Sequence, residues 1–508
     1  MDLTTQIREL VNNLNGNMAP SPYDIAWMAR IPNQHQDGAR WPELINWLIE
    51  NQWLDGSWGG TIRYYHDRIL CTLAAIIALK QHGPKHVGAI AEEAIERGER
   101  YIWHNLHRLL HDPFELVGFE LILPNLLMEA LALGLDVPKH TCGYGAIRRE
   151  KLSLIPPEML YSPKISTVHS LEFLGKDGSP EKMEKALSPN GSLGNSPATT
   201  SYYILQGGKN ERAFEYLEMI LNHREHVIYL YPCDTFELTW VLHSLSFCDD
   251  ALVEWVDEKH WDTLEAQISE RGIGLDPSFG IEDGDITSVT TRLLKLAGRP
   301  VSTSILARFQ DPEKHIFRTY DYERNPSIGT NIHALEAITV YPDYPNREEI
   351  TDRVLAFLLA NRVFDTYWVD KWHASPYYAT AHVLIGILKA APHIVDECKR
   401  TIEWIMHTQR EDGSWGFFEK GTVEETAYAM TALLRSKGHF DIDREQLRRG
   451  ASFLYREMSY GGLEALSVDN SYSYPPLWIG KPLYVPKDIV RASILAALRL
   501  CEEHIGPM

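Results

Sequence analysis

The stretch QWLDGSWGG at Gln52–Gly60 decides the fold class, because it returns near the other end of the chain as QREDGSWGF at Gln409–Phe417. A weaker copy, SPNGSLGNS, lies at Ser188–Ser196. Asp-Gly-Ser forms a tight turn in which glycine takes a positive φ, and the following Trp can pack over the end of the preceding helix. Copies this far apart predict two related helical domains, in which the motif acts as a staple between helices.

The segments around the motif are rich in helix formers. Arg68–Lys80 (RILCTLAAIIALK) is apolar on most faces, as expected of a helix buried between neighbours. Ala381–Ala390, Glu425–Leu434 and Asp488–Leu500 have the same character, and long alternating strand patterns are missing. We therefore predict an all-α protein.

Composition narrows the class of partner. The 508 residues contain 49 Lys and Arg against 69 Asp and Glu, a net charge of −20, which argues against nucleic-acid binding. Six cysteines without a CxxC pair suggest free thiols in a reducing compartment. We find no signal peptide and no apolar run of about 20 residues, so we expect a cytoplasmic protein without a transmembrane segment.

A cluster of carboxylates is the strongest candidate for chemistry. The stretch GIEDGDITSVTTRLLKLAGRP at 280–300 predicts a helix that begins near Asp283 and Asp285, with Glu282 beside them. Acidic residues often do no more than cap a helix. Three of them in four positions exceed that need, and two carboxyls packed in an apolar cavity would share a proton and supply a Brønsted acid.

The residues around Asp283 and Asp285 also match a known sequence pattern. DGDITSVTTRLL resembles the D-x-D-D/T-T segment of class II terpene cyclases, which protonate an alkene with the middle Asp. The resemblance covers nearly the whole chain, through SPYDIAW at 21–27, VGFELILP at 117–124, HSLE at 169–172, DKWHASPYYATAH at 370–382, EETAYAM at 424–430 and PPLWIGKPLY at 475–484. Length and motif order are most similar to bacterial halimadienyl (tuberculosinyl) and kolavenyl diphosphate synthases.

This resemblance implies two α/α-barrel domains with the substrate cavity between them. The β domain would comprise residues 1–20 and 231–508, and the γ domain, residues 21–230, would be inserted after the first helix. The implied activity is that of an isomerase (intramolecular lyase), a class II diterpenyl diphosphate synthase that cyclises geranylgeranyl diphosphate and keeps the diphosphate. A class I terpene synthase or a phosphatase would then act on the product. Class I ionisation is not expected, because CDDALV at 248–253 lacks the third carboxylate of the class I motif.

The family motifs assign the acid. Asp285 matches the general acid, and Asp283 with the helix start would stabilise its conjugate base. Asn331 matches an Asn that hydrogen-bonds the acid. Ile286 departs from the family pattern, which has Asp or Thr there, but it removes neither carboxylate.

The same comparison assigns substrate contacts. Lys151 lies at the spacing of a diphosphate-binding Lys, and Lys481 is a second candidate. Trp372, Tyr377 and Tyr378 would line the cavity and stabilise carbocations through their π faces. Mg²⁺ is implied as an aid to diphosphate binding, but the acidic segment of plant members reads RLLHD at 108–112, which leaves the metal ligands undefined.

The end of the reaction depends on His169 and Tyr229. Similar copalyl synthases hold a deprotonating water between a His and an Asn; His169 matches the His, and Tyr229 stands at the Asn position. Loss of that water predicts a longer-lived cation and a rearranged, kolavenyl- or halimadienyl-type product. A copalyl or C15 drimenyl product stays open, as do, more remotely, a helical-toroid glycosidase and a non-catalytic helical binding protein.

Overall fold

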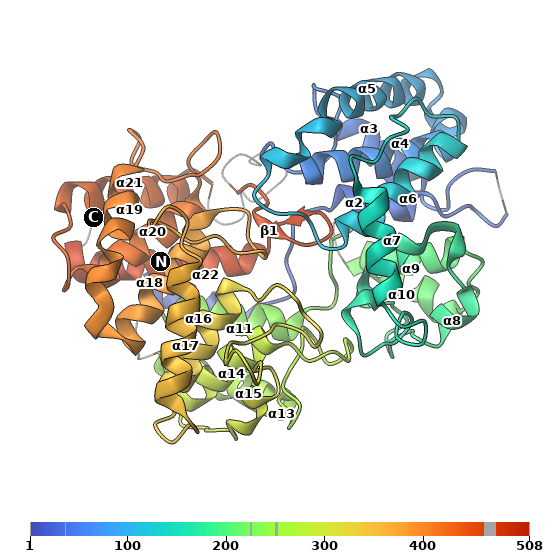
Figure 1. The fold of residues 1–508 in the computed structure, drawn as a ribbon. Helices are drawn as coiled ribbons and strands as arrows, with labels where there is room; N and C mark the ends of the chain where they lie inside the picture. Colours follow the sequence, from blue (N-terminus) through green and yellow to red (C-terminus); the bar gives the residue numbers. More distant parts are fainter. Residues whose placement is uncertain (1, 36, 224–225, 249–251, 462–473, 507–508) are drawn as a thin grey trace.

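Two hydrophobic cores organise the chain in the computed structural model, which describes residues 2–35, 37–223, 226–248, 252–461 and 474–506 (Figure 1). The first core takes residues from Leu3 to Met18 and from Ile228 to Cys501. The second takes mainly residues from Tyr23 to Val227. The cores therefore separate close to residues 20 and 230. Among the described residues no helix is both long and apolar enough to cross a membrane.

The first core is enclosed by a closed ring of helices, in which each packs on the next and the last returns to the first. In ring order these are α11 (Asp234–Leu245), α14 (Gly284–Leu296), α16 (Ile328–Thr339), α18 (Pro376–Ala390), α20 (Val423–Ser436) and α22 (Lys487–Ile505). The other helices of this body are α1 (Leu3–Asn12), α12 (Leu252–Trp255), α13 (Glu258–Gln267), α15 (Ser304–Ala307), α17 (Arg347–Ala360), η3 (Pro392–Cys398), α19 (Lys399–His407) and α21 (Arg444–Gly461).

The second core has a smaller ring of the same kind. Its inner members are α2 (Pro22–Ala29), α4 (Tyr65–Val87), α6 (Phe119–Ala132), η2 (Ser166–Asp177) and α9 (Pro197–Leu205). Outside them lie α3 (Pro42–Glu50), α5 (Ala89–Asn105), η1 (Leu106–His111), α7 (Tyr144–Leu154), α8 (Pro180–Glu184) and α10 (Glu211–His223). The predicted all-α class with two helical barrels is thus confirmed.

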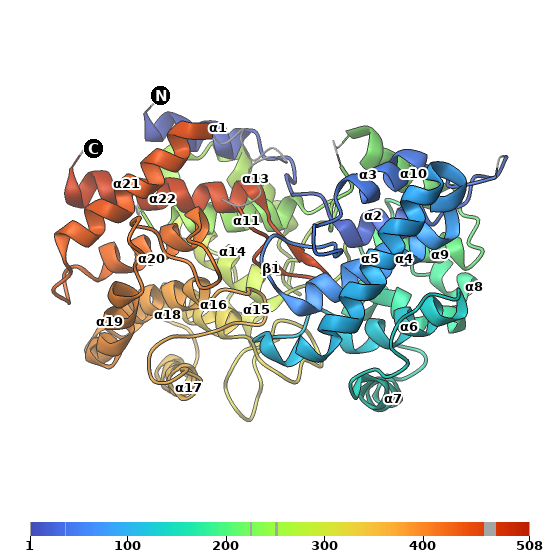
Figure 2. The same ribbon diagram turned by 90° about the horizontal axis from the view of Figure 1, so that it is seen from above.

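A short hairpin connects the two bodies. Its strands, β1 (Trp478–Ile479) and β2 (Leu483–Tyr484), pair antiparallel, with Trp478 opposite Tyr484. Trp478 packs in the first core, whereas Ile479 and Leu483 pack in the second. Figures 1 and 2 both show β1 between the two helical bodies.

The repeated motif acts as a staple. Trp58 and Trp415 each donate the indole N–H to a carbonyl ten residues earlier, at 2.7 Å. Their backbone N–H groups donate to the hydroxyls of Thr72 and Thr426 on the following helix. Trp368, which the sequence motif does not reveal, makes the same pair of contacts. The staple fixes an outer helix to an inner one, as the motif predicts.

We expect Trp415→Phe to lower the free energy of unfolding by about 0.5–1.5 kcal/mol, because the Ile405 carbonyl loses its indole donor and keeps the Thr408 hydroxyl, while most of the ring packing is kept. Urea denaturation measures the change. Trp404→Phe, at a half-buried indole on α19, is the matched control and should cost less. Equal losses in the two variants would contradict the staple.

Candidate active site

A cavity of about 290 Å³ lies between the two bodies. The second body contributes residues of α6 and η2, among them Leu121, His169 and Phe173, and the first body contributes the starts of α11, α14 and α18. The wall is mostly apolar and aromatic. Among the described lining residues the only carboxylates are Asp283 and Asp285.

Asp283 caps α14. One of its oxygens accepts the backbone N–H groups of Asp285 and Ile286, at 2.7 and 3.0 Å, and the Tyr320 hydroxyl donates to its carboxylate. Burial, and after it the charge of Asp285, raise the pKa of Asp283 to about 7. The cap places Asp285 in the first turn of the helix, with its side chain at the cavity wall.

Behind Asp285 lies a chain of buried imidazoles. Asp285 Oδ1 is 2.7 Å from His333 Nδ1, and His333 Nε2 is 2.8 Å from His382 Nδ1. Burial, followed by the proximity of His333, holds the pKa of His382 well below its usual range, so this ring is neutral. Neutral rings satisfy both contacts when His382 donates to His333 and His333 donates to Asp285. Asp285 Oδ1 is thereby occupied, and Oδ2 is left for the cavity.

Asn331, the expected partner of the acid, bonds elsewhere. Its amide donates to the carbonyls of Phe317 and Ser327, and its Oδ1 accepts the Phe317 backbone N–H at 2.8 Å. It therefore repeats the staple that threonines make at the tryptophan turns. His333, two residues along the same helix, makes the bond to Asp285 that the sequence assigns to Asn331.

His169 and Tyr229 meet in the wall that faces the carboxylates. The His169 Nδ1–H donates to the Gly194 carbonyl at 2.7 Å, and the Tyr229 hydroxyl donates to His169 Nε2 at 2.8 Å. Burial, followed by the charge of Lys481, lowers the pKa of His169 to about 3, so the ring is neutral. Burial raises the pKa of Tyr229 well above its usual value. The one free lone pair of His169 is thus taken by Tyr229.

Neither expected diphosphate-binding lysine has a free ammonium at the cavity. Lys151 pairs with Glu120 at 2.5 Å and is not among the lining residues. Lys481 is fully buried: it pairs with Glu172 at 2.8 Å and donates to the His169 carbonyl and to the hydroxyls of Ser196 and Thr199. Lys481 thus joins the hairpin to the second body.

Only two of the three expected aromatic residues line the cavity. Trp372 and Tyr378 line the cavity, whereas Tyr377 stacks on Trp404 of the outer layer, with ring centroids 4.8 Å apart. Sequence reasoning missed further rings in the wall, among them Trp240 and Trp478. Ring contacts of Trp240 with His333 and of Tyr378 with His382 join this aromatic wall to the imidazole chain.

A preformed Mg²⁺ site does not emerge from the described residues. Their one group of three metal-capable side chains is His243, His333 and His382, whose nitrogens suit transition metals better than Mg²⁺. In the RLLHD segment, Asp112 is buried and engaged with the backbone and ring nitrogens of His66.

The chain is similar to known proteins over nearly its whole length. The family model described as squalene-hopene cyclase C-terminal domain matches residues 324–467. A "Type B diterpene cyclase" of Mycobacterium tuberculosis (strain ATCC 25618 / H37Rv) is 34% identical over 96% of this chain and 97% of its own length. An "Ent-copalyl diphosphate synthase" of Streptomyces sp. (strain KO-3988) is 29% identical over 97% of this chain and 94% of its own. The solved ent-copalyl diphosphate synthase from Streptomyces platensis superposes with a TM-score of 0.76 at 28% identity, over 98% of each chain.

The buried pair of Lys481 and Glu172 makes a stability prediction. Lys481→Met leaves Glu172 without its cation, and we expect the free energy of unfolding to fall by about 3–5 kcal/mol. Lys151→Met, at a half-exposed pair, should cost less than about 1 kcal/mol. Urea denaturation measures both. A Lys481→Met enzyme of unchanged stability but raised KM would instead restore the substrate-binding role expected from the sequence.

Proposed function

The chain belongs to the class II diterpene cyclase family, and from this premise we propose that it cyclises geranylgeranyl diphosphate to a bicyclic, rearranged diterpenyl diphosphate. The observation that carries the proposal is the pairing, in one apolar cavity, of Asp285 backed by His333 with His169 capped by Tyr229. The diphosphate is retained, so a class I synthase or a phosphatase would consume the product.

Asp285 starts the reaction as general acid. The proton on Oδ2 passes to the terminal alkene, so that a C–H bond forms, the O–H bond breaks and a tertiary carbocation begins the ring closure. An alkene is a very weak base, and the step therefore needs a dry site and a stabilised conjugate base. The His333 N–H bond to Oδ1 and the start of α14 supply that stabilisation.

The aromatic wall favours the cation over the ground state. Trp240, Trp372, Tyr378 and Trp478 line the same cavity as Asp285. Their ring faces attract positive charge without offering a nucleophile, so they stabilise the migrating cation and do not trap it. The described residues hold no site built for Mg²⁺. We therefore propose that Mg²⁺ binds together with the diphosphate, and none of these steps passes through the metal.

The end of the reaction follows from the contact between His169 and Tyr229. A neutral His could remove a proton through its free lone pair, but Tyr229 already donates to that atom. The 2.8 Å contact also leaves no place for a water between the two groups. With early deprotonation suppressed, hydride and methyl shifts have time to occur, which favours a kolavenyl- or halimadienyl-type skeleton over copalyl.

A glycosidase fits less well. Such enzymes place two carboxyls on opposite sides of the scissile bond, about 5–10 Å apart. Here the two carboxylates share one helix start, and Asp283 is used as its cap. A purely binding protein would not need an acid with an imidazole chain behind it.

The acid is tested by Asp285→Asn. Purified enzyme is incubated with geranylgeranyl diphosphate and Mg²⁺, and the dephosphorylated product is identified by mass spectrometry. We expect kcat to fall by roughly 10²–10⁴ or more, because the proton donor is lost. Asp276→Asn is the matched control, since this carboxylate is nearly as buried but bonds to Ser278 outside the cavity wall. Full turnover by Asp285→Asn would refute the role of the acid.

The base is tested by Tyr229→Phe. The change frees His169 Nε2, so we expect unrearranged copalyl-type alcohol to rise from a minor to a major share of the product. Tyr484→Phe, whose ring lies 4.9 Å from Tyr229 in the same wall, should leave the product ratio unchanged. If the wild-type enzyme makes only copalyl diphosphate, the inference about termination is wrong. If it leaves geranylgeranyl diphosphate unchanged, farnesyl diphosphate is the next substrate to test.

A further inference from the structure

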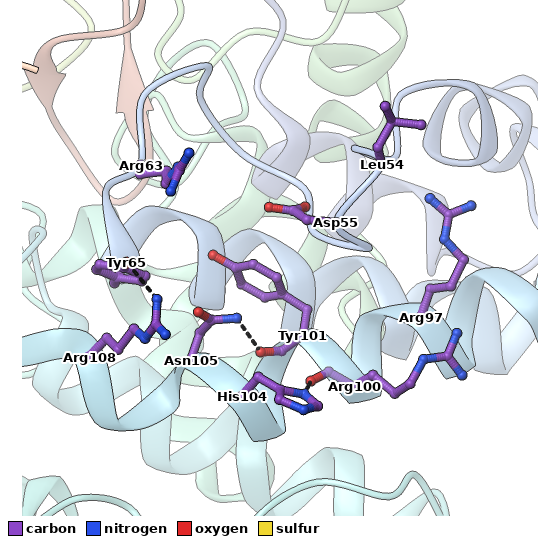
Figure 3. Close-up of a pocket in the computed structure, with 10 residues that line it drawn as sticks. All are labelled: Leu54, Asp55, Arg63, Tyr65, Arg97, Arg100, Tyr101, His104, Asn105 and Arg108. Atoms are coloured by element: carbon purple, nitrogen blue, oxygen red, sulfur yellow. Dashed lines mark hydrogen bonds between the residues drawn. The ribbon is translucent and has the colours of Figure 1, made fainter. Parts of the chain in front are cut away.

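A second hollow lies in the second body, away from the central cavity. Its volume is about 600 Å³, and it shares no lining residue with the cavity that holds Asp285. The loop after α3, the start of α4, the second half of α5 and η1 build it (Figure 3). The reaction proposed above makes no use of this hollow.

Positive charge gathers here against the trend of the chain. Arg63, Arg97, Arg100 and Arg108 line the hollow, and among the described lining residues Asp55 is the one carboxylate. The surplus of three positive charges stands out in a protein of net charge −20. Figure 3 shows Arg63 and Arg108 on one side and Arg97 and Arg100 on the other.

Two of the guanidinium groups are held in place by single hydrogen bonds, which leave most of their N–H donors unpaired. Arg97 donates from one nitrogen to the Trp53 carbonyl at 2.8 Å, and Arg108 donates to the Tyr65 hydroxyl at 3.2 Å. A guanidinium carries five N–H donors, so most of them stay available. Arg63 and Arg100 make only exposed ion pairs, with Glu419 at 3.2 Å and Glu96 at 3.8 Å, and such pairs exchange easily for another anion.

The carboxylate of Asp55 already has partners. Its Oδ1 accepts both the backbone N–H and the hydroxyl of Ser57, and Arg68 lies 3.8 Å away. The motif that contains Asp55 also positions Arg97, because Gly56, at φ +92°, packs directly against the Arg97 backbone. An added Cβ at Gly56 would lie 2.4 Å from the Arg97 carbonyl oxygen.

The second copy of the motif provides an internal comparison. Gly413 packs in the same way against Arg449, and Gln409 bonds across its turn as Gln52 does. The Arg449 guanidinium, however, donates to Gln409. The staple is thus shared by both copies, and the converging arginines are a separate feature of the first.

We propose that this hollow, the arginine hollow, binds the diphosphate group of a small hydrophilic molecule. Guanidinium forks match phosphate oxygens in pairs, and two pairs on opposite sides suit an anion with charge at two positions. The walls offer the rings of Tyr65 and Tyr101 but, apart from Leu54, no aliphatic surface, so a C20 prenyl chain would find no cover. The two sources of this chemistry are free pyrophosphate and a nucleoside diphosphate.

The test is calorimetric titration of the full-length protein with inorganic pyrophosphate and, separately, with ADP, at about 0.15 M salt so that non-specific attraction is screened. Pyrophosphate is also a fragment of the proposed substrate and can enter the central cavity. The decisive comparison is therefore between wild type and Arg97→Gln/Arg100→Gln, with Arg449→Gln as the matched control at the second motif.

We expect the double variant to bind at least tenfold more weakly, and Arg449→Gln to bind like the wild type, with unfolding temperatures unchanged in both. Tighter binding of ADP than of pyrophosphate would support a nucleotide held against the tyrosine rings; equal binding would support recognition of the diphosphate alone. No saturable binding by wild type, or equal binding by wild type and the double variant, would overturn the proposal. Because binding is the readout, the result is independent of cyclase activity.

Discussion

The buried ion pair between Lys481 and Glu172 is the contact on which the central cavity depends. Lys481 stands in the turn of the hairpin whose β1 carries Trp478 into the first core, and Glu172 lies in η2 of the second body. Such a pair repays its desolvation only when the remaining protons are bonded, and here the His169 carbonyl and two hydroxyls lie within hydrogen-bond distance of the other two ammonium protons. The pair therefore fixes the wall that contains His169 against the body that contains the acid.

Sequence reasoning reached the features that local chemistry determines. The positions of Asp283 and Asp285 follow from a helix cap, and the staple follows from a turn motif, so both could be read from a few adjacent letters. The sequence could not show whether Asn331 or His333 makes the hydrogen bond to Asp285. The two lie two residues apart on one helix, and their side chains point roughly 200° apart. Only the packing of α16 against α14 decides which of them meets Asp285.

Neither lysine nor Tyr377 lies at the cavity wall, for a related reason. A lone Lys in a motif can face a ligand or a buried carboxylate, and the partner of Lys481 lies more than 300 residues away in the chain. Tyr377 and Tyr378 are adjacent, so a helix turns them to different sides, and only Tyr378 reaches the cavity. Trp240 lies in none of the quoted motifs, and in the motif that contains Trp478 the sequence points to Lys481 instead. Both line the cavity because the fold brings α11 and β1, which are far apart in the sequence, to the same wall.

The acid and the candidate base differ in how the protein prepares them. The acid is backed by a donor, His333, which stabilises the carboxylate that forms when the proton leaves. The base is opposed by a donor, Tyr229, which occupies the lone pair that would take a proton back. In the proposed reaction, initiation is therefore assisted and termination is hindered, in one cavity whose remaining wall is mostly apolar and aromatic. On this proposal, the lifetime of the cation, and with it the extent of rearrangement, depends on the strength of the hydrogen bond from the Tyr229 hydroxyl to His169.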